Sequence, residues 1–269
     1  MSPMTLIRHF RTYSRNPNGC RPPGPPRTRY RFLVFSPLVL GRPGPWENWR
    51  PATCLPDDCF CEAIRDGLVR QPANTWTSLA FVAAALFVAA RVFRREGPRS
   101  GPLPSAEAAL LAGSLALVGL GSAFYHASLT FPGQVLDVSG MYLVATFILL
   151  HRLGPRFGVP PLLSVPGFVL ANAALMTAQV TTPSLRRVVF GALLAAALFV
   201  EWRSSRAGRT WLAAEASLMV VAFAIWVVDR QRLACAPDSL IQGHALWHLL
   251  GALASVCLYL NYEAEAAAP

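Results

Sequence analysis

The stretch SLALVGLGSAFYHASLTFPGQVLDVSGMYLVATFILL, residues 114–150, contains two long apolar runs separated by a short, more polar turn. Apolar runs of about 20 residues are long enough to cross the hydrocarbon core of a bilayer as helices. Ser122, His126 and Asp137 nevertheless lie at the facing ends of these two runs. Ionisable groups are costly inside a membrane and usually functional, so we expect this polar set to form part of a site.

The rest of the chain repeats the pattern of apolar runs and short connections. The 269 residues are 54% hydrophobic and only 14% charged, whereas globular domains carry roughly a quarter charged residues. We therefore predict an all-α fold, a seven-transmembrane helix bundle with short loops. The predicted spans are 74–93, 106–126, 134–152, 161–180, 185–202, 210–228 and 239–261.

Three regions follow from this pattern. Residues 1–50 are rich in Pro, Gly and Arg, a composition that cannot bury enough apolar surface to fold, so we expect a disordered tail. Residues 51–73 form a segment that precedes the first span, and residues 74–262 form the seven-span domain.

The charge is strongly basic, with a formal net charge of +10. The sequence has no zinc-finger, RNA-binding or basic amphipathic pattern, so we do not expect nucleic-acid binding. Arginine is more frequent after the first, third and fifth spans than at the opposite ends. The positive-inside rule then places the N-terminus outside and the C-terminus in the cytoplasm of a multi-pass membrane protein.

Three histidines can meet at one end of such a bundle. Ser122 and His126 are one helical turn apart, and GHALWH at 243–248 places His244 and His248 on one helix face. Three imidazoles and a water are a common ligand set for catalytic zinc, which supplies hydroxide at neutral pH. Asp137 would orient or deprotonate that water, and Ser122 would donate to a developing oxyanion. This chemistry predicts a zinc site near one membrane face.

Simpler interpretations of the same residues remain open. Each histidine could be a packed bundle residue, and the Ser122 hydroxyl could bond back to a helix carbonyl. A haem held by two histidines on separate helices is another alternative, although the third histidine and Asp137 count against it.

The motifs resemble those of the alkaline ceramidase family. The resemblance rests on SAFYH at 122–126 with Asp137, on GHALWH at 243–248, and on Cys61 and Glu62 followed by PANTWTSLAF at 72–81. It implies a seven-helix zinc amidase that cleaves ceramide into a sphingoid base and a fatty acid. Zinc-bound hydroxide would attack the amide, with zinc on His126, His244 and His248, Asp137 as base and Ser122 stabilising the oxyanion.

The wider superfamily includes adiponectin-receptor-like proteins. A receptor-like protein, or a hydrolase of another acyl lipid, is therefore the alternative function.

The resemblance also implies a disulfide and a second metal. It pairs Cys61 with Cys235, which requires an oxidising compartment on the side of the zinc site. Animal members of the family carry a calcium site before the first span, and here Glu62 and Asp58 are candidate calcium ligands. Gln71 stands where a second acid would fall, and these acids could equally face water.

Overall fold

The computed structural model describes residues 44–55, 60–94, 103, 105–159, 161–205 and 209–268. All of these belong to one of the two units of the chain, Arg42–Pro269. Most of the predicted tail lies outside the described residues. Asp58, in the segment before the first helix, also lies outside them. The last part of that tail, 44–50, is structured, since the Trp46 indole donates a 2.9 Å hydrogen bond to the Leu68 carbonyl.

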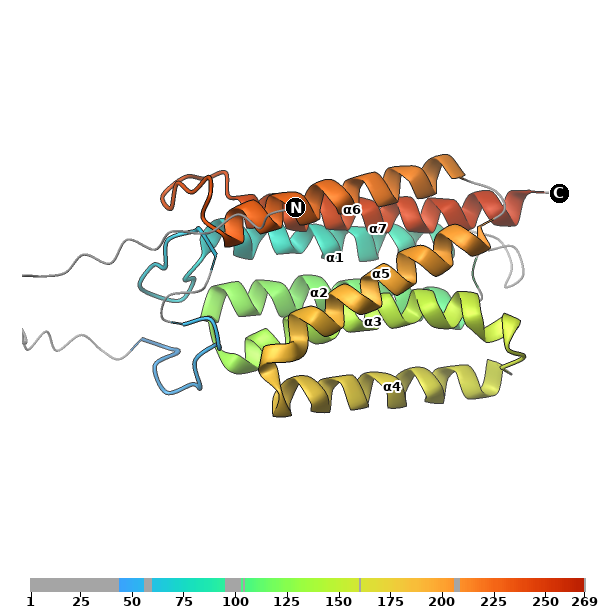
Figure 1. Ribbon diagram of the computed structural model, residues 1–269, viewed down its shortest axis with the longest axis horizontal. Coiled ribbons are helices and arrows are strands. Elements are labelled where there is room, and N and C mark those ends of the chain that lie inside the picture. The colour runs from blue at the N-terminus through green and yellow to red at the C-terminus, as the bar shows by residue number, and fades with distance from the viewer. Residues whose placement is uncertain are drawn as a thin grey trace, which may run out of the picture. The chain divides into compact units, whose positions relative to one another are not determined.

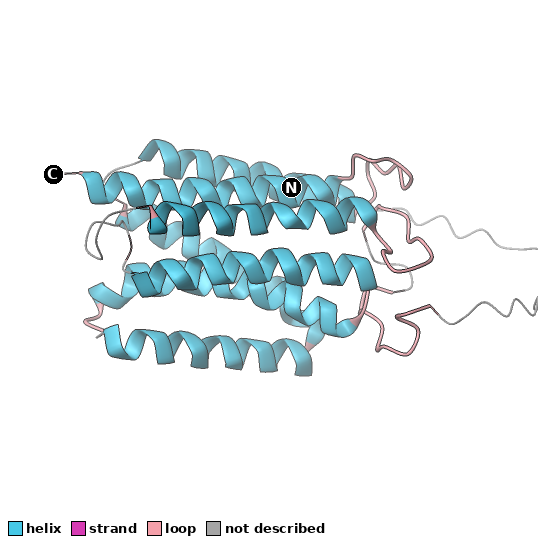
Figure 2. Cartoon of the chain, turned by 180° about the vertical axis from the view of Figure 1, so that it is seen from behind, coloured by secondary structure: helices cyan, strands magenta, loops and turns pink. Residues whose placement is uncertain are grey.

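The described residues form seven α-helices and one short 3-10 helix, and they contain no strand (Figures 1 and 2). The elements are α1 (Pro72–Phe93), α2 (Ser105–Ser128), α3 (Phe131–Arg156), α4 (Pro161–Thr181), η1 (Pro183–Leu185), α5 (Arg186–Ser204), α6 (Arg209–Arg230) and α7 (Gly243–Ala267).

Within the described ranges, six of the helices, namely α1, α2, α3, α5, α6 and α7, are long and apolar enough to cross a membrane. The α4 helix carries two amide side chains, Asn172 and Gln179. Both amides contact α3, where Asn172 Nδ2 donates to Thr146 Oγ1 at 2.9 Å and Gln179 Nε2 donates to Ser139 Oγ at 2.7 Å. These two amides therefore bind α4 to α3.

Capping residues shift the helix ends away from the predicted ones. The α3 helix begins at Phe131 rather than 134, because the Thr130 side chain accepts from the Gly133 amide and a proline occupies the first turn. Only Leu129 and Thr130 remain between α2 and α3, so Asp137 lies nearly two turns inside α3. The last helix begins at Gly243 rather than 239 and continues to Ala267.

The helices pack unevenly. The α1 helix packs against α2 and α7, α3 packs against α2, α4 and α5, and α6 packs mainly against α7. In Figure 1, α5 crosses obliquely over α3 while α6 lies alongside α7. Because α5 and α6 touch each other only sparsely, the space between them is not filled by helix packing.

Glycines bring the backbones of α2 and α3 into direct contact. A Cβ atom at Gly140 would lie 2.6 Å from the Val118 amide nitrogen, and one at Gly121 would lie 2.9 Å from the Leu136 carbonyl. Small residues of this kind let membrane helices approach closely and gain van der Waals contact. This contact positions Ser122 on α2 beside Asp137 on α3.

A side chain at Gly140 should force these two helices apart. We expect Gly140→Val to destabilise the protein by about 1–3 kcal/mol or more, as overpacking of a filled interface does. Thermal unfolding in detergent measures the loss. Gly113→Val is the matched control, because a Cβ at Gly113 meets nothing within 4 Å. Equal stability of the two variants would contradict the prediction.

Candidate metal centre and apolar cavity

The three predicted histidines meet in the structure. His126 projects from α2, and His244 and His248 project from α7 one turn apart. All three are buried, and their ligand nitrogens lie within 4.8 Å of one another. The closest pair, His126 Nε2 and His244 Nε2, is 3.2 Å apart.

A neighbouring amide fixes the orientation of His126. Its Nδ1 lies 2.8 Å from Gln71 Oε1, while the Gln71 Nε2 group donates to the Glu62 carbonyl at 3.1 Å. With the Gln71 oxygen facing the ring, His126 Nδ1 must carry the hydrogen. The Nε2 atom of His126 then presents a lone pair to the other two histidines.

Hydroxyl groups of α1 fix His248 in the same way. Its Nδ1 lies 3.1 Å from Thr77 Oγ1 and 3.4 Å from Ser78 Oγ. Each hydroxyl already donates its own hydrogen to a helix carbonyl, of Ala73 and Asn74 respectively. Both hydroxyls can therefore only accept from the ring. The hydrogen of His248 is on Nδ1, so its Nε2 carries a lone pair that can bind a metal.

Such an arrangement fits a zinc ion. Lone pairs of at least two imidazoles point into one buried space, where a cation would neutralise their repulsion. Two nitrogens bound to the same tetrahedral zinc at about 2.0–2.1 Å stand roughly 3.3 Å apart, close to the 3.2 Å between His126 and His244. The same proximity leaves no room for a flat macrocycle between these rings, so the geometry does not favour haem.

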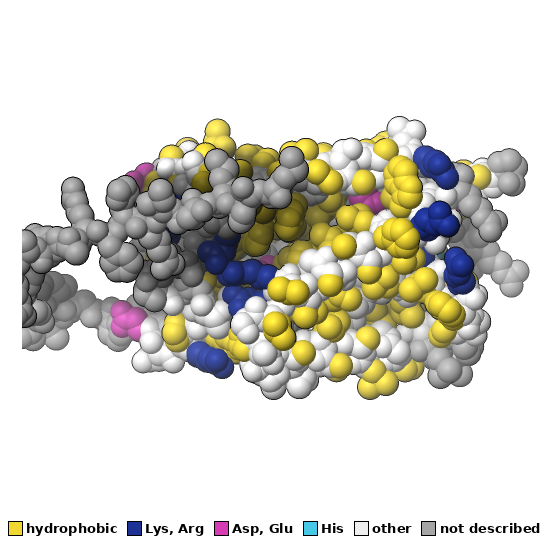
Figure 3. Space-filling view, viewed as in Figure 1, with side chains coloured by type: hydrophobic (Ala, Val, Ile, Leu, Met, Phe, Trp, Pro, Cys, Tyr) yellow, Lys and Arg dark blue, Asp and Glu magenta, His cyan; other side chains and the backbone are white. Residues whose placement is uncertain are grey.

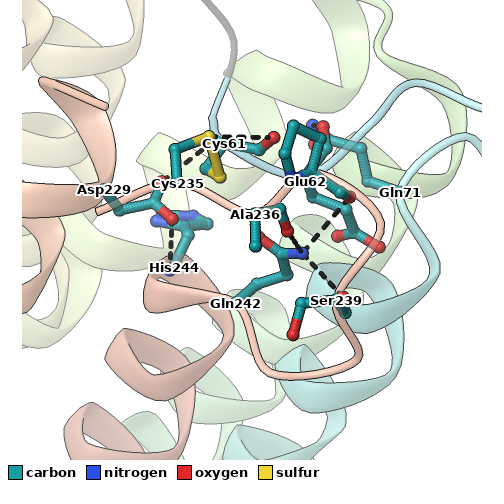
Figure 4. Close-up of a disulfide and its surroundings, with 10 residues drawn as sticks. Cys61, Glu62, Gln71, Asp229, Cys235, Ala236, Ser239, Gln242 and His244 are labelled. Carbon is teal, nitrogen blue, oxygen red and sulfur yellow. Dashed lines mark hydrogen bonds between the residues drawn. A yellow bond between two sulfur atoms is a disulfide. The ribbon is translucent and has the colours of Figure 1, made fainter. Parts of the chain in front are cut away.

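The first turn of α7 is held by an acid from α6. The Asp229 carboxylate accepts from the backbone amides of His244 and Cys61, each at 3.2 Å (Figure 4). The N-cap residue of α7, Gln242, makes no capping bond with its side chain, so Asp229 serves instead. Gly243 permits this approach, because a Cβ there would lie 2.8 Å from Asp229 Cβ. Sequence analysis did not assign Asp229 to the site.

A disulfide joins the segment before α1 to the loop between α6 and α7. Cys61 is bonded to Cys235, with their Cα atoms 5.5 Å apart (Figure 4). This is the pair that the family resemblance implied. The preceding residue, Phe60, stacks on the His244 ring with centroids 3.6 Å apart. The disulfide therefore holds an aromatic cover over the histidines.

Glu62 caps α1 in this structure. Its two carboxylate oxygens accept from the backbone amides of Ala73, at 2.6 Å, and Asn74, at 2.9 Å. Charge at a helix N-terminus is favourable, and here it also ties the segment before α1 to the residues that orient the histidines. Its proposed calcium partner, Asp58, lies outside the described residues, so calcium binding stays a prediction.

Ser122 and Asp137 lie beside the histidines at one end of a cavity. Ser122 Oγ is 3.3 Å from His248 Nε2, and its side chain interacts with the Asp137 carboxyl. The cavity measures about 370 Å³ and lies among α2, α3, α5, α6 and α7, with mostly apolar walls. Figure 3 shows this face hollowed between α5 and α6, with hydrophobic side chains lining the hollow.

Buried histidines, a neighbouring acid and an apolar cavity define a helical membrane-type protein with a candidate metal centre that faces a largely apolar cavity. The sequence model of the ceramidase family matches residues 64–266, and the chain belongs to that family. It is 29% identical over 170 residues to the Dictyostelium discoideum protein named "Putative alkaline ceramidase dcd3B", covering 52% of this chain. The match spans 58% of the length of that relative.

Gln71 should matter for metal affinity although it cannot reach the metal. Partners that orient a ligating histidine typically contribute 10–100-fold to affinity, so we expect Gln71→Leu to lower zinc affinity by about that factor. Zinc content after equilibration with graded concentrations of a chelator measures the change. Gln179→Leu, which removes a buried amide from α4, is the control. Native affinity in Gln71→Leu would contradict this role.

The burial of the Glu62 carboxyl should make the stability of the protein depend on pH. Burial raises the pKa of its carboxyl above the ordinary 4.5, although the amides of Asn74 and Ala73 and the charge of Arg65 act in the opposite direction. The folded state thus binds this proton more tightly than the unfolded state does. The free energy of unfolding should fall as pH rises from 4.5 through the raised pKa.

Thermal unfolding in calcium-free buffer at a series of pH values tests the Glu62 prediction. Glu62→Gln should remove this component of the pH dependence, whereas Asp66→Asn, at an exposed acid of the same segment, should keep it. Identical pH profiles for the native protein and Glu62→Gln would refute the assignment.

Proposed function

We propose that this protein hydrolyses the amide bond of ceramide to release a sphingoid base and a free fatty acid. The convergence of three buried imidazole nitrogens at one end of an apolar cavity is the observation that supports it most directly. Zinc on His126, His244 and His248 is the proposed cofactor, and all seven helices, α4 included, are proposed to cross the membrane.

A zinc ion held by three imidazoles acts as a Lewis acid and lowers the pKa of a water to about 7, which supplies the nucleophile. Asp137 would take the proton of the attacking water and return it to the leaving nitrogen, so that the sphingoid base departs as an amine. Its carboxyl lines the cavity next to Ser122, where a scissile amide would lie.

Ser122 is proposed to stabilise the charge that develops on the amide oxygen. Its hydroxyl is buried and points toward His248 Nε2. If that nitrogen held the metal, it could no longer accept from Ser122, and the hydroxyl would be available to donate to the oxyanion. Removing a preorganised donor of this type typically lowers turnover by about 10²–10³-fold.

The cavity favours a lipid as substrate over a soluble amide. Its walls are mostly apolar, so they can receive an alkyl chain, and the hollow between α5 and α6 gives a route from the hydrocarbon of the bilayer. A substrate that enters this way does not have to leave the membrane.

Sidedness is part of the same proposal. The Cys61–Cys235 disulfide lies next to the histidines, and disulfides persist in oxidising compartments. The arginine distribution favours the same orientation. We place the metal centre on the non-cytoplasmic side and the C-terminus of α7 in the cytoplasm.

Fatty-acid release from labelled ceramide by the detergent-purified protein tests the proposal. We expect a zinc chelator to abolish release and added zinc to restore it, because the nucleophile depends on the metal. No release from protein shown to contain zinc would overturn the ceramidase assignment in favour of another acyl lipid or a receptor-like role.

Two variants separate catalysis from binding in that assay. Asp137→Asn should lose turnover while retaining zinc, and Ser122→Ala should lose about 10²–10³-fold in turnover at unchanged zinc content. Ser139→Ala is a suitable control, since Ser139 lies on α3 and accepts from Gln179 of α4. Full turnover in Asp137→Asn would contradict the proposed proton transfer.

A further inference from the structure

The cavity is elongated along the helix axes. On α6 its lining residues are Trp226, Phe223, Met219 and Glu215, which are spaced three or four apart and so share one face. From Trp226 to Glu215 is 11 residues, which at about 1.5 Å per residue corresponds to roughly 16 Å. The cavity therefore extends well beyond the site of the proposed chemistry.

The neighbouring helices place Glu215 at the end remote from the histidines. On α7 the lining runs from His244 to Leu258, a rise of roughly 21 Å. The α6 and α7 helices lie side by side and follow one another across the single loop that carries Cys235, so they are antiparallel (Figure 1). Glu215, early in α6, thus lies at the level of the later turns of α7.

Glu215 is a buried carboxyl that the proposed chemistry does not use. It is 4% exposed, and its Oε2 atom has no hydrogen-bond partner among the described residues. The nearby guanidinium of Arg152 is already shared by two other acids, Glu201 and Glu265. A polar atom buried in this way carries a desolvation cost that a suitable ligand would recover.

We infer that Glu215 forms a hydrogen-bonding subsite for a hydroxyl group on the alkyl chain of the lipid. The inference rests on the proposed lipid substrate, and it adds that the cavity prefers a hydroxylated alkyl chain to an unsubstituted one. An unsubstituted chain would leave Glu215 Oε2 without a partner, whereas a hydroxylated chain would supply one. Trp226 contacts Trp247, the neighbour of His248, and so lies near the level of the proposed chemistry. At roughly 1.2 Å per bond of an extended chain, the 16 Å from Trp226 to Glu215 corresponds to about a dozen bonds.

Binding of two free fatty acids tests this subsite without requiring turnover. Octadecanoic acid and 12-hydroxyoctadecanoic acid would each displace a fluorescent fatty acid from the purified, zinc-loaded protein. We expect the native protein to bind the hydroxylated acid about threefold to tenfold more tightly, the effect of one hydrogen bond.

Glu215→Leu should abolish or reverse this preference, and Met219→Leu, one turn away on the same cavity wall, should keep it. The loss of an unpaired polar atom should also raise the thermal stability of lipid-free Glu215→Leu, so that misfolding does not obscure the result. An unchanged preference in Glu215→Leu, or no binding of either acid to the native protein, would overturn the inference.

Turnover of ceramides carrying the same two acyl chains distinguishes the two proposals. Cleavage of both ceramides without any chain preference would overturn the Glu215 subsite and leave the amidase intact. A binding preference that depends on Glu215, in a protein that cleaves neither ceramide, would support the subsite while overturning the amidase.

Discussion

Backbone contact between α2 and α3 determines what the polar residues of this protein can do. Inside a bilayer, helices gain little from hydrophobic burial against one another, so they associate where small residues let their backbones touch. Gly121 and Gly140 supply such a contact, and the connection between the helices is only two residues long. A serine and an acid on different helices are thereby held as neighbours without any bond between their backbones.

The histidines depend on a second set of constraints, which lies at the ends of the helices and in the loops that join them. Asp229 binds the first turn of α7, Gln71 orients the His126 ring, and the Cys61–Cys235 disulfide fastens the segment that covers them. Each links residues far apart in the sequence. Loops and helix ends therefore hold the candidate metal centre together, while the helices carry the histidines and form the walls of the cavity.

The helices and the three histidines could be predicted from the sequence because their signals are local. Apolar length identifies a span, and the spacing of His244 and His248 identifies a shared face. Gln71 and Asp229 could not be assigned, because their roles arise from contacts between distant segments. The start of α3 was misplaced by three residues, since the Thr130 cap and the following proline outweigh hydropathy there. The Cys61–Cys235 pair came from family resemblance alone.

The hollow between α5 and α6 has a kinetic consequence. A protein that takes its ligand through such a side opening meets only ligand molecules that diffuse within the bilayer. The concentration that sets the rate of encounter is therefore the mole fraction of ligand in the membrane. Diluting the bilayer with inert lipid would slow encounter even if the total amount of ligand in the vessel stayed constant. Under the proposed function, the released chains would return to the membrane, where they would compete for the cavity they had just left.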